Sequence, residues 1–383
     1  VSKIFEQINT KGKRLKGFAL MNNRMAPFVI LNKLWKNTLK KYPKIKTYDN
    51  KLKPGNLSQY ILESISLSYT DSKSCRGPDV LDMYHDNVDR KGWTPEIFED
   101  MWNKITEYTN RAIEKLENRQ SGFGVQSADV LPYEPMLPVL ASLIQYVSEE
   151  LKNKGIIFEE KIKKWFWSSV FHQRYNQGVQ GIKTADYKAM INWFKHEEEV
   201  PKFITDFERD YQRIDFESVT SSRSAIYRGV LCLIMKQGAL DPKLSLYDES
   251  KKPDMDHIFP KSKIKEQVKH SILNMTWLTD ITNSGKNNTM PKEWYTKIIK
   301  DDYAGNDSKL HKVLSSHLIN DDTYYYLMEN NFEEFIESRR KEILKTIADE
   351  IGIDYNDENE QHRQITSDNI YENAIAIRDA VKK

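Results

Sequence analysis

Apolar residues recur at three- and four-residue steps over most of the first 238 positions, which is the pattern of amphipathic helices. The clearest segment begins at Thr94, a residue type that caps helices, and continues with Pro95 and acidic residues in the first turn. Its expected apolar face consists of Ile97, Met101, Ile105, Tyr108, Ala112 and Leu116. Further helices are predicted within 133–155, 158–175, 184–199 and 221–238. We therefore expect a helical bundle or array over residues 26–238.

The helical period stops near position 239. The stretch "ALDPKLSLYDESKKPDMDHIFP" has Asp-Pro and Lys-Pro pairs and short apolar runs, which predict short strands and loops. A second apolar run, "MTWLT", predicts another strand, and "TNSGKNN" after it is turn-like. Helical pattern resumes at 290–300, at 331–352 and, weakly, at 369–383. The predicted fold is mainly α, with a small strand–loop–strand–helix unit inserted into the helices.

Composition narrows the class of protein without changing this fold. The sequence has no uncharged apolar run of 18 residues, so we expect no membrane span. The two cysteines, Cys75 and Cys232, lie far apart and match no metal-ligand spacing. A reducing, cytoplasmic location is the simplest interpretation.

Charge is nearly balanced in total, with a formal net charge of +2, but it is distributed unevenly. Residues 1–55 hold fourteen Lys or Arg against Glu6 and Asp49, whereas residues 321–360 hold thirteen acids against four basic residues. The basic segment 1–55 suggests a surface for nucleic acid. The acidic segment 321–360 suggests an end that is solvated or that covers part of the protein itself. Solvent-exposed helix faces explain the same pattern equally well. Because the chain begins inside a patterned segment, we expect further protein upstream of Val1.

The stretch "DMDHIFPKSKI" places Asp256 and His257 side by side, with Pro260 and lysines after them. Histidine can take a proton from water near neutral pH, and aspartate oxygen suits Mg²⁺ or Mn²⁺. Phosphodiester hydrolysis needs both a base and a cation, on roughly opposite sides of the phosphorus. Neighbours on a strand point to opposite faces, so this pair can divide these tasks where Pro260 ends the strand.

For an Asp-His pair alone, a surface loop with one hydrogen-bonded histidine is the favoured interpretation. The second stretch adds two amides in order, Asn274 before the second strand and Asn283 in the turn-like segment after it. Asn283 supplies a neutral oxygen where a second metal ligand is needed.

Together, "DHIFPKS" and "LNMTWLTDITNSGKNNTMPKEWY" resemble the HNH (ββα-metal) nuclease motif. The variant is that of the C-terminal domain of GmrSD-type modification-dependent restriction enzymes, and its spacing is similar to the HNH domain of RNA-guided CRISPR effector nucleases. The resemblance implies that Asp256 and Asn283 hold one Mg²⁺ or Mn²⁺ and that His257 is the general base. It also implies that Asn274 braces the motif loop and that Lys286 contacts phosphate or braces the helix.

The resemblance also divides the chain. Residues 1–25 look like the tail of a ParB-like nucleotidase domain, 26–238 like a helical connector, 239–310 like the HNH domain, and 311–383 form a C-terminal helical segment. The Asp-Gly-Gln-Arg type motif of the nucleotidase site is absent from the sequence. Nucleotide would therefore act only through a domain upstream of Val1, as part of the same longer protein.

The expected function is metal-dependent cleavage of DNA, in restriction of foreign or base-modified phage DNA. Flanking phosphates would contact Lys261, Lys263, Lys265 and Lys286, which is an attraction independent of base sequence. Two alternatives stay open. The unit can be a relic in a non-catalytic adaptor that binds a partner or nucleic acid, or the nuclease can act on RNA.

Other chemistry-bearing residues are expected to be structural. His172 could line a site with Arg174 and Tyr175, but a packed helix histidine is the favoured interpretation. The remaining candidates show no ligand spacing or lie on helical patterns. We expect surface positions for His196, His270, His311 and His317, and core positions for Trp165, Trp167 and Trp193.

Overall fold

The computed structural model describes residues 17–53, 55–151, 155–244, 254–264 and 268–356. This part of the chain is mainly helical, with one small two-stranded sheet. The first helices are α2 (Gly17–Met25), α3 (Leu31–Lys41), α4 (Pro43–Lys51), α5 (Asn56–Tyr69), α6 (Gly77–Lys91), α7 (Pro95–Glu117), α8 (Met136–Glu150), α9 (Gly155–Phe171), α10 (Val179–Lys195), α11 (Lys202–Asp210) and α12 (Ala225–Lys236). The later elements are β1 (Asp254–His257), β2 (Met275–Leu278), α13 (Asp280–Lys286), α14 (Pro291–Asp302), α15 (Asp307–Ser315), α16 (Asp321–Met328) and α17 (Phe332–Ile351). Short 3-10 turns lie at Ala128–Val130, Tyr211–Arg213 and Ile272–Asn274.

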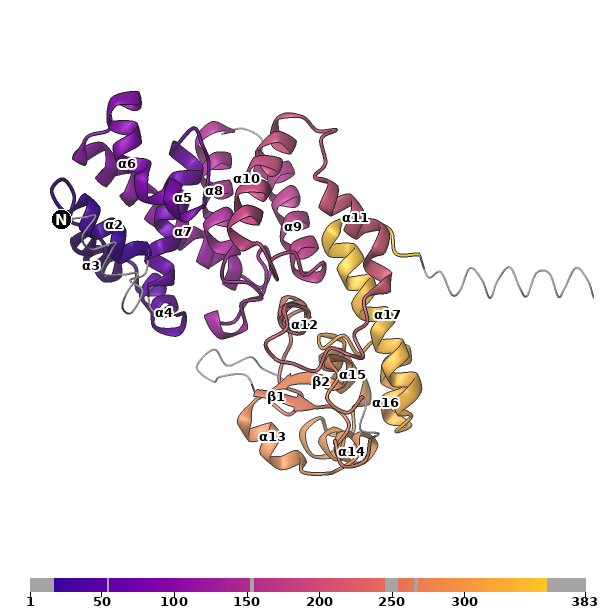
Figure 1. Ribbon diagram of the computed structural model, residues 1–383. Helices are drawn as coiled ribbons and strands as arrows, with labels where there is room; N and C mark the ends of the chain where they lie inside the picture. The colour runs from indigo at the N-terminus through magenta and orange to yellow at the C-terminus, as the bar shows by residue number, and fades with distance from the viewer. Residues whose placement is uncertain (1–16, 54, 152–154, 245–253, 265–267, 357–383) are drawn as a thin grey trace, which may run out of the picture.

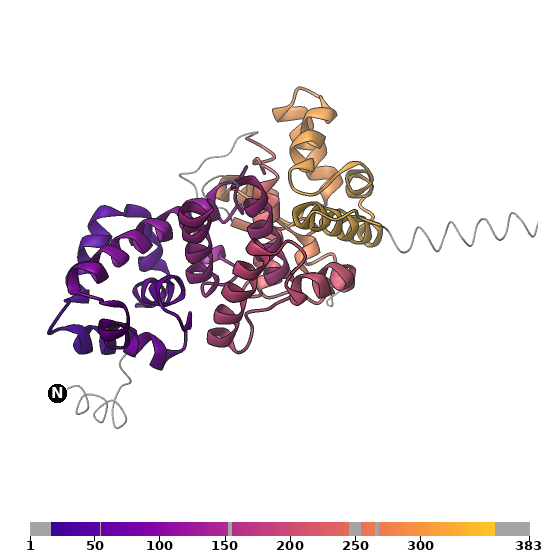
Figure 2. The same ribbon diagram turned by 90° about the horizontal axis from the view of Figure 1, so that it is seen from above.

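Helices α2 to α7 form an N-terminal lobe at one end of the molecule (Figures 1 and 2). Its own apolar core includes Met21 of α2 and Leu34 of α3. The predicted cap of α7 is confirmed, because Thr94 accepts a hydrogen bond from the backbone N–H of Ile97. The predicted apolar face is wrong at its start: Ile97 is 44% exposed, whereas Phe98 and Trp102 are buried. The buried face of the first turn is therefore shifted by one residue from the predicted face.

Helices α8 to α12 connect the N-terminal lobe to the small sheet (Figure 1). The expected core positions of the tryptophans are confirmed, since Trp165, Trp167 and Trp193 are all buried. Buried indole N–H groups need acceptors. Trp165 donates to Asp186 at 3.0 Å, and Trp167 donates to Glu350 of α17 at 2.8 Å. The second bond fixes the C-terminal helix against α9.

The small sheet packs into the same core as the connector and the C-terminal helices. Strand β1 runs antiparallel to β2, and Asp256 pairs with Thr276 while His257 pairs with Met275. Phe259, just after β1, lies 5.0 Å from Phe335 of α17 between ring centroids. Two strands of four residues are not stable alone, so the surrounding helices must supply the apolar surface that they bury.

Two buried polar side chains join the C-terminal helices to this sheet. Arg339 of α17 is fully buried and donates to the carbonyl oxygens of Leu273 at 2.7 Å and His317 at 3.2 Å. Burial lowers the pKa of Arg339 to about 9. His317, expected at the surface, is instead 0% exposed and contacts the hydroxyl of Thr276 and the carbonyl of Leu240, each at 2.7 Å. A carbonyl only accepts, so His317 Nε2 carries the proton and Nδ1 accepts from Thr276.

Among the described residues, none of the helices is both long and apolar enough to cross a membrane. Both cysteines are buried and free. Lys265, residues 1–16 of the expected upstream tail and the predicted helix at 369–383 lie outside the described residues. The described remainder of that tail, α2, packs into the core of the N-terminal lobe.

The buried state of His317 predicts a specific loss of stability in acid. Burial is the main cause that lowers its pKa from 6.5 to about 4. Between pH 6.5 and pH 4 His317 binds a proton in the unfolded chain but not in the folded chain. The stability that neutral His317 contributes is therefore fully present above pH 6.5 and is lost as the pH falls through 4. From pH 7 to pH 4 this histidine should remove about 3 kcal/mol from the free energy of unfolding.

Urea unfolding of His317→Gln between pH 4 and pH 7 measures this contribution. The variant should be less stable at pH 7 but should lose about 3 kcal/mol less than the native chain on acidification. His196→Gln, at an exposed position, is the control and should follow the native chain. Parallel pH curves for the native chain and His317→Gln would contradict the assignment.

Candidate functional site

Strand β1 presents Asp256 and His257 to opposite sides. The Asp256 carboxylate contacts Lys286 of α13, whereas the His257 ring contacts His270 in the loop before β2. Adjacent strand residues alternate in direction, which explains this division. The strand ends as predicted before Pro260.

Asn274 is the most constrained side chain of the unit. Its Oδ1 accepts from the backbone N–H of Phe259 at 2.8 Å, and its Nδ2 donates to the carbonyls of Phe259 and Lys269, each at 3.1 Å. Its own carbonyl accepts from the N–H of Ile258 at 2.7 Å. The side chain is 0% exposed. These bonds hold the residues just after His257 against the segment that carries His270.

His257 and His270 form a contact that sequence spacing did not reveal. Their Nε2 and Nδ1 atoms are 3.1 Å apart, and their rings meet edge to face with centroids 5.1 Å apart. Burial is the main cause that lowers the pKa of His257 below 6.5, Asp256 opposes it, and His270 adds to it. His257 is therefore neutral at neutral pH. Its Nε2 faces His270, and Nδ1 is the ring nitrogen outside that contact.

The residues on both sides of His270 are anchored. Lys269 accepts the bond from Asn274, and Ser271 Oγ donates to the carbonyl of Phe216 at 3.0 Å. The N–H of Ile272 donates to the carbonyl of Val219 at 2.9 Å. His270 itself is exposed, as expected, but its position is fixed by these neighbours. The connector loop at 214–219 thus supports the histidine pair.

Helix α13 begins at a buried carboxylate that sequence analysis passed over. Asp241 accepts from the N–H and hydroxyl of Thr279 at 2.9 and 2.8 Å and from the hydroxyl of Thr282 at 2.7 Å. The N–H groups of Lys243 and Leu244 also donate to it, each at 3.0 Å. Burial alone would raise the pKa of Asp241, but these hydrogen bonds lower it below 3.8. A carboxylate at a helix N-terminus also complements the helix dipole.

Asn283 and Lys286 share one face of α13, because they are three residues apart. Asn283 therefore lies in a helix and not in the turn that its sequence suggested. Thr279 caps this helix by accepting from the backbone N–H of Thr282. The helix therefore begins at Asp280, and Gly285 lies within it. The face that carries both side chains is turned toward β1, since Lys286 contacts Asp256.

Lys286 is buried between α13 and β1. Its ammonium lies 2.8 Å from Asp256 Oδ2, donates to the carbonyl of His257 and lies 5.5 Å from the ring centroid of Trp294. The side chain is only 3% exposed, so it does not reach flanking phosphates in this conformation. Burial lowers the pKa of Lys286, while Asp256 acts in the opposite direction. Its observed contacts brace α13 against β1.

The oxygen atoms near Lys286 suit a hard divalent cation. Asp256 is 21% exposed, and within the described residues its Oδ1 has no hydrogen-bond donor. Asn283, on the same face of α13 as Lys286, adds an amide oxygen. The described residues contain no group of three His, Cys, Asp or Glu suited to a metal. This donor set fits Mg²⁺ or Mn²⁺, which binds through one or two protein oxygens with water and phosphate completing the shell.

The lysines after Pro260 differ in what the structure shows of them. Lys261 and Lys263 are exposed, and Lys261 is close enough to His257 to contribute to lowering its pKa. Lys265 lies outside the described residues. Lys261 and Lys263 are therefore the predicted phosphate contacts that the structure places at the surface.

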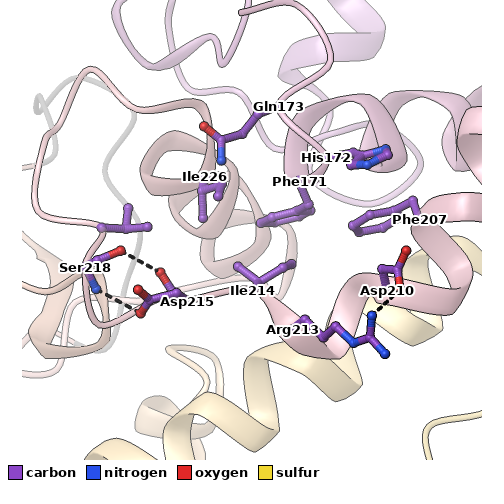
Figure 3. Close-up of a pocket in the computed structure, with 11 residues that line it drawn as sticks. Phe171, His172, Gln173, Phe207, Asp210, Arg213, Ile214, Asp215, Ser218 and Ile226 are labelled. Atoms are coloured by element: carbon purple, nitrogen blue, oxygen red, sulfur yellow. Dashed lines mark hydrogen bonds and ion pairs between the residues drawn. The ribbon is translucent and has the colours of Figure 1, made fainter.

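His172, in the turn after α9, lies apart from its expected partners Arg174 and Tyr175. Arg174 and Tyr175 both bond to Asp186, at 2.7 and 2.8 Å. His172 lines a separate cavity of about 290 Å³, beside Phe207 (Figure 3). The charged groups Asp210 and Arg213 at this cavity pair with each other at 3.0 Å. Asp215, the other carboxylate at the cavity, accepts from the backbone N–H of Ser218 at 3.2 Å (Figure 3), and we assign no function to the cavity.

Comparison with known proteins leaves the family open. No family model matches the chain. The chain is 25% identical over 379 residues to the uncharacterized protein MJ0686 of Methanocaldococcus jannaschii, a match that covers 91% of this chain and 61% of that protein. The chain thus spans about three fifths of the relative's length.

The Asn274 bonds predict a large loss of stability on substitution. Asn274→Ala leaves the buried N–H and carbonyl of Phe259 without these partners and removes a donor from the partly buried carbonyl of Lys269, and each loss at a buried group costs about 1–3 kcal/mol. We expect the free energy of unfolding to fall by about 3 kcal/mol or more in urea titrations. Asn288→Ala, at an exposed position, is the control and should change it by less than about 0.5 kcal/mol. Equal stability of the two variants would show that the amide is dispensable.

Proposed function

We propose that this chain is a metal-dependent endonuclease of the HNH (ββα-metal) type that hydrolyses DNA phosphodiester bonds. One observation carries the proposal: β1 directs His257 and Asp256 to opposite sides, with a neutral imidazole on one and a carboxylate beside α13 on the other. Base and cation ligand are thereby separated as in-line displacement at phosphorus requires. Residues 239–310 would then be the nuclease unit inserted between the connector and the C-terminal helices.

In the proposed reaction His257 is the general base. Its Nε2 contacts His270, so Nδ1 is the nitrogen that takes a proton from the attacking water. The water oxygen bonds to phosphorus as the bond to the 3′ oxygen breaks, which leaves a 5′-phosphate and a 3′ alkoxide. The alkoxide takes a proton from solvent water to become the 3′-hydroxyl, and His257 later returns its proton to solvent. Asn274 keeps the base in place through the backbone of Phe259. Lys261 and Lys263 attract the neighbouring phosphates.

Asp256 and Asn283 would hold one Mg²⁺ or Mn²⁺, which supplies charge stabilisation at the scissile phosphate and the leaving oxygen. Lys286 fixes the orientation of Asp256 through the Oδ2 contact and leaves Oδ1 for the cation. It also neutralises a carboxylate that would otherwise be partly buried without a partner.

The biological setting is proposed from the GmrSD-type resemblance. We propose restriction of foreign DNA, base-modified phage DNA included, with an upstream ParB-like nucleotidase domain in the same protein. RNA as the substrate is the nearest alternative, because backbone contacts and hydrolysis use chemistry that both nucleic acids share.

Plasmid nicking in Mg²⁺ or Mn²⁺ tests the proposal. Loss of a positioned general base typically costs 10²–10⁴-fold, so His257→Ala should nick at least about 100-fold more slowly while it still binds DNA. Asp256→Asn should lose the metal-dependent rate. His196→Ala, at an exposed position, is the matched control and should nick like the native chain.

Three outcomes would count against the proposal. Equal nicking by all variants would assign the activity to a contaminant. Cleavage of RNA but not of duplex or single-stranded DNA would replace the substrate. No cleavage of any nucleic acid by the full-length protein would favour the adaptor alternative.

The histidine contact predicts a second, graded effect. His270→Ala removes the group against His257 Nε2 and should lower kcat about tenfold or more with KM unchanged, since small displacements of a base are costly. His270→Asn places an amide near the position of the lost Nδ1 and should recover most of kcat. A purely structural role would lower both variants equally, and an unchanged kcat in His270→Ala would show that the contact plays no part.

A further inference from the structure

Helices α3 and α4 of the N-terminal lobe expose a dense set of lysines. Between residues 31 and 53 the only acidic residue is Asp49. All the lysines of this span are exposed, and we call them the α3–α4 lysine surface: Lys33, Lys36, Lys40, Lys41, Lys44, Lys46, Lys51 and Lys53. Like charges at this density repel one another, so the surface is costly unless an anion binds it.

Most of this surface has no acidic partner among the residues that the structure describes. Lys44 pairs with Glu117, and Lys51 lies 3.3 Å from Asp129. Within the described part of the chain the other six lysines of the surface form no ion pair. Their charge is therefore available to a ligand.

The lysines of α3 lie in a row on a helix that is held firmly. Lys33, Lys36 and Lys40 are three and four residues apart, which places them on one face. The opposite face is buried through Leu31 and Leu34, and Trp102 of α7 donates to Thr38 at 3.1 Å. Seven residues of helix rise about 10 Å, a length over which duplex DNA carries about six phosphate charges.

This surface is separate from the candidate site. In both views the N-terminal lobe lies at one end, with the connector between it and the unit that contains β1 and β2 (Figures 1 and 2). Its outward face is mainly polar: α3 exposes Asn32 and Asn37 beside the lysines and buries Leu31 and Leu34. A mainly polar face, with Ile30 at the N-cap of α3 as its exposed apolar side chain, suits a hydrated phosphate backbone better than insertion into a lipid surface.

We propose that the α3–α4 lysine surface binds the phosphate backbone of duplex DNA, as a second contact region away from the cleavage site. The choice of duplex DNA rests on the proposed function, whereas the choice of a polyanion rests on the lysines alone. The surface reads no bases, since lysines on phosphates position a duplex without selecting its sequence. It would lengthen the footprint of the protein on DNA beyond the nuclease unit.

The test compares two triple variants in the His257→Ala background, where the duplex stays intact. The first replaces Lys33, Lys36 and Lys40 with Gln; the control replaces the exposed Lys188, Lys195 and Lys202 with Gln, an equal change in charge. Binding of a fluorescent 30-base-pair duplex is measured by anisotropy at several salt concentrations. The first variant should bind at least about tenfold more weakly at low salt, and the slope of log K against log salt should fall by about 3. The control should match the background protein.

Four results would overturn the proposal. Equal binding by both triple variants, or no duplex binding by the background protein, removes the surface as a DNA contact. Loss of binding only to single-stranded RNA of the same length, or only to vesicles with 30% phosphatidylserine, assigns it to another partner. Plasmid nicking by the same triple in the native His257 background separates the two proposals. If the lysine triple variant binds the duplex more weakly than its background protein while the native chain nicks no plasmid, the surface proposal is retained and the nuclease proposal is rejected.

Discussion

The side-chain amide of Asn274 is the constraint on which the candidate site depends. It satisfies both backbone groups of Phe259 and the carbonyl of Lys269 from a fully buried position. These bonds join the end of β1 to the start of β2 through residues that flank both histidines. A buried amide with every bond made is rigid, whereas the same amide with one bond missing is costly. The distance between His257 and His270 follows from this arrangement.

The same logic extends outward from the sheet. Two four-residue strands bury too little apolar surface to stand alone, so buried polar groups fix them to the helices around them. Asp241 holds the start of α13, Arg339 holds the residue before Asn274, and His317 holds the middle of β2. Each makes directional bonds that an apolar contact would not supply, and together they define where Asp256 and Lys286 meet.

Local signals predicted much of this from sequence. The cap at Thr94, the prolines that begin helices and the alternation at Asp256 and His257 act within a few residues, and the structure agrees with them. Long-range packing could not be predicted. The His257–His270 contact spans 13 residues and exists because Asn274 folds the loop back. For Lys286 the sequence left open whether it contacts phosphate or braces the helix. Nothing local shows that α13 starts at a cap held by Asp241 and directs Lys286 at Asp256.

The central claim is that Asp256 and Asn283 hold one cation beside the phosphate while Lys286 keeps its contact with Oδ2. Crystals of the His257→Ala protein with duplex DNA and Mn²⁺, measured at the manganese absorption edge, test it directly. The account predicts one anomalous peak about 2.0–2.3 Å from Asp256 Oδ1 and the Asn283 amide oxygen, with a phosphate oxygen in the same shell. A peak elsewhere, or a bound duplex with no manganese at Asp256, would contradict it.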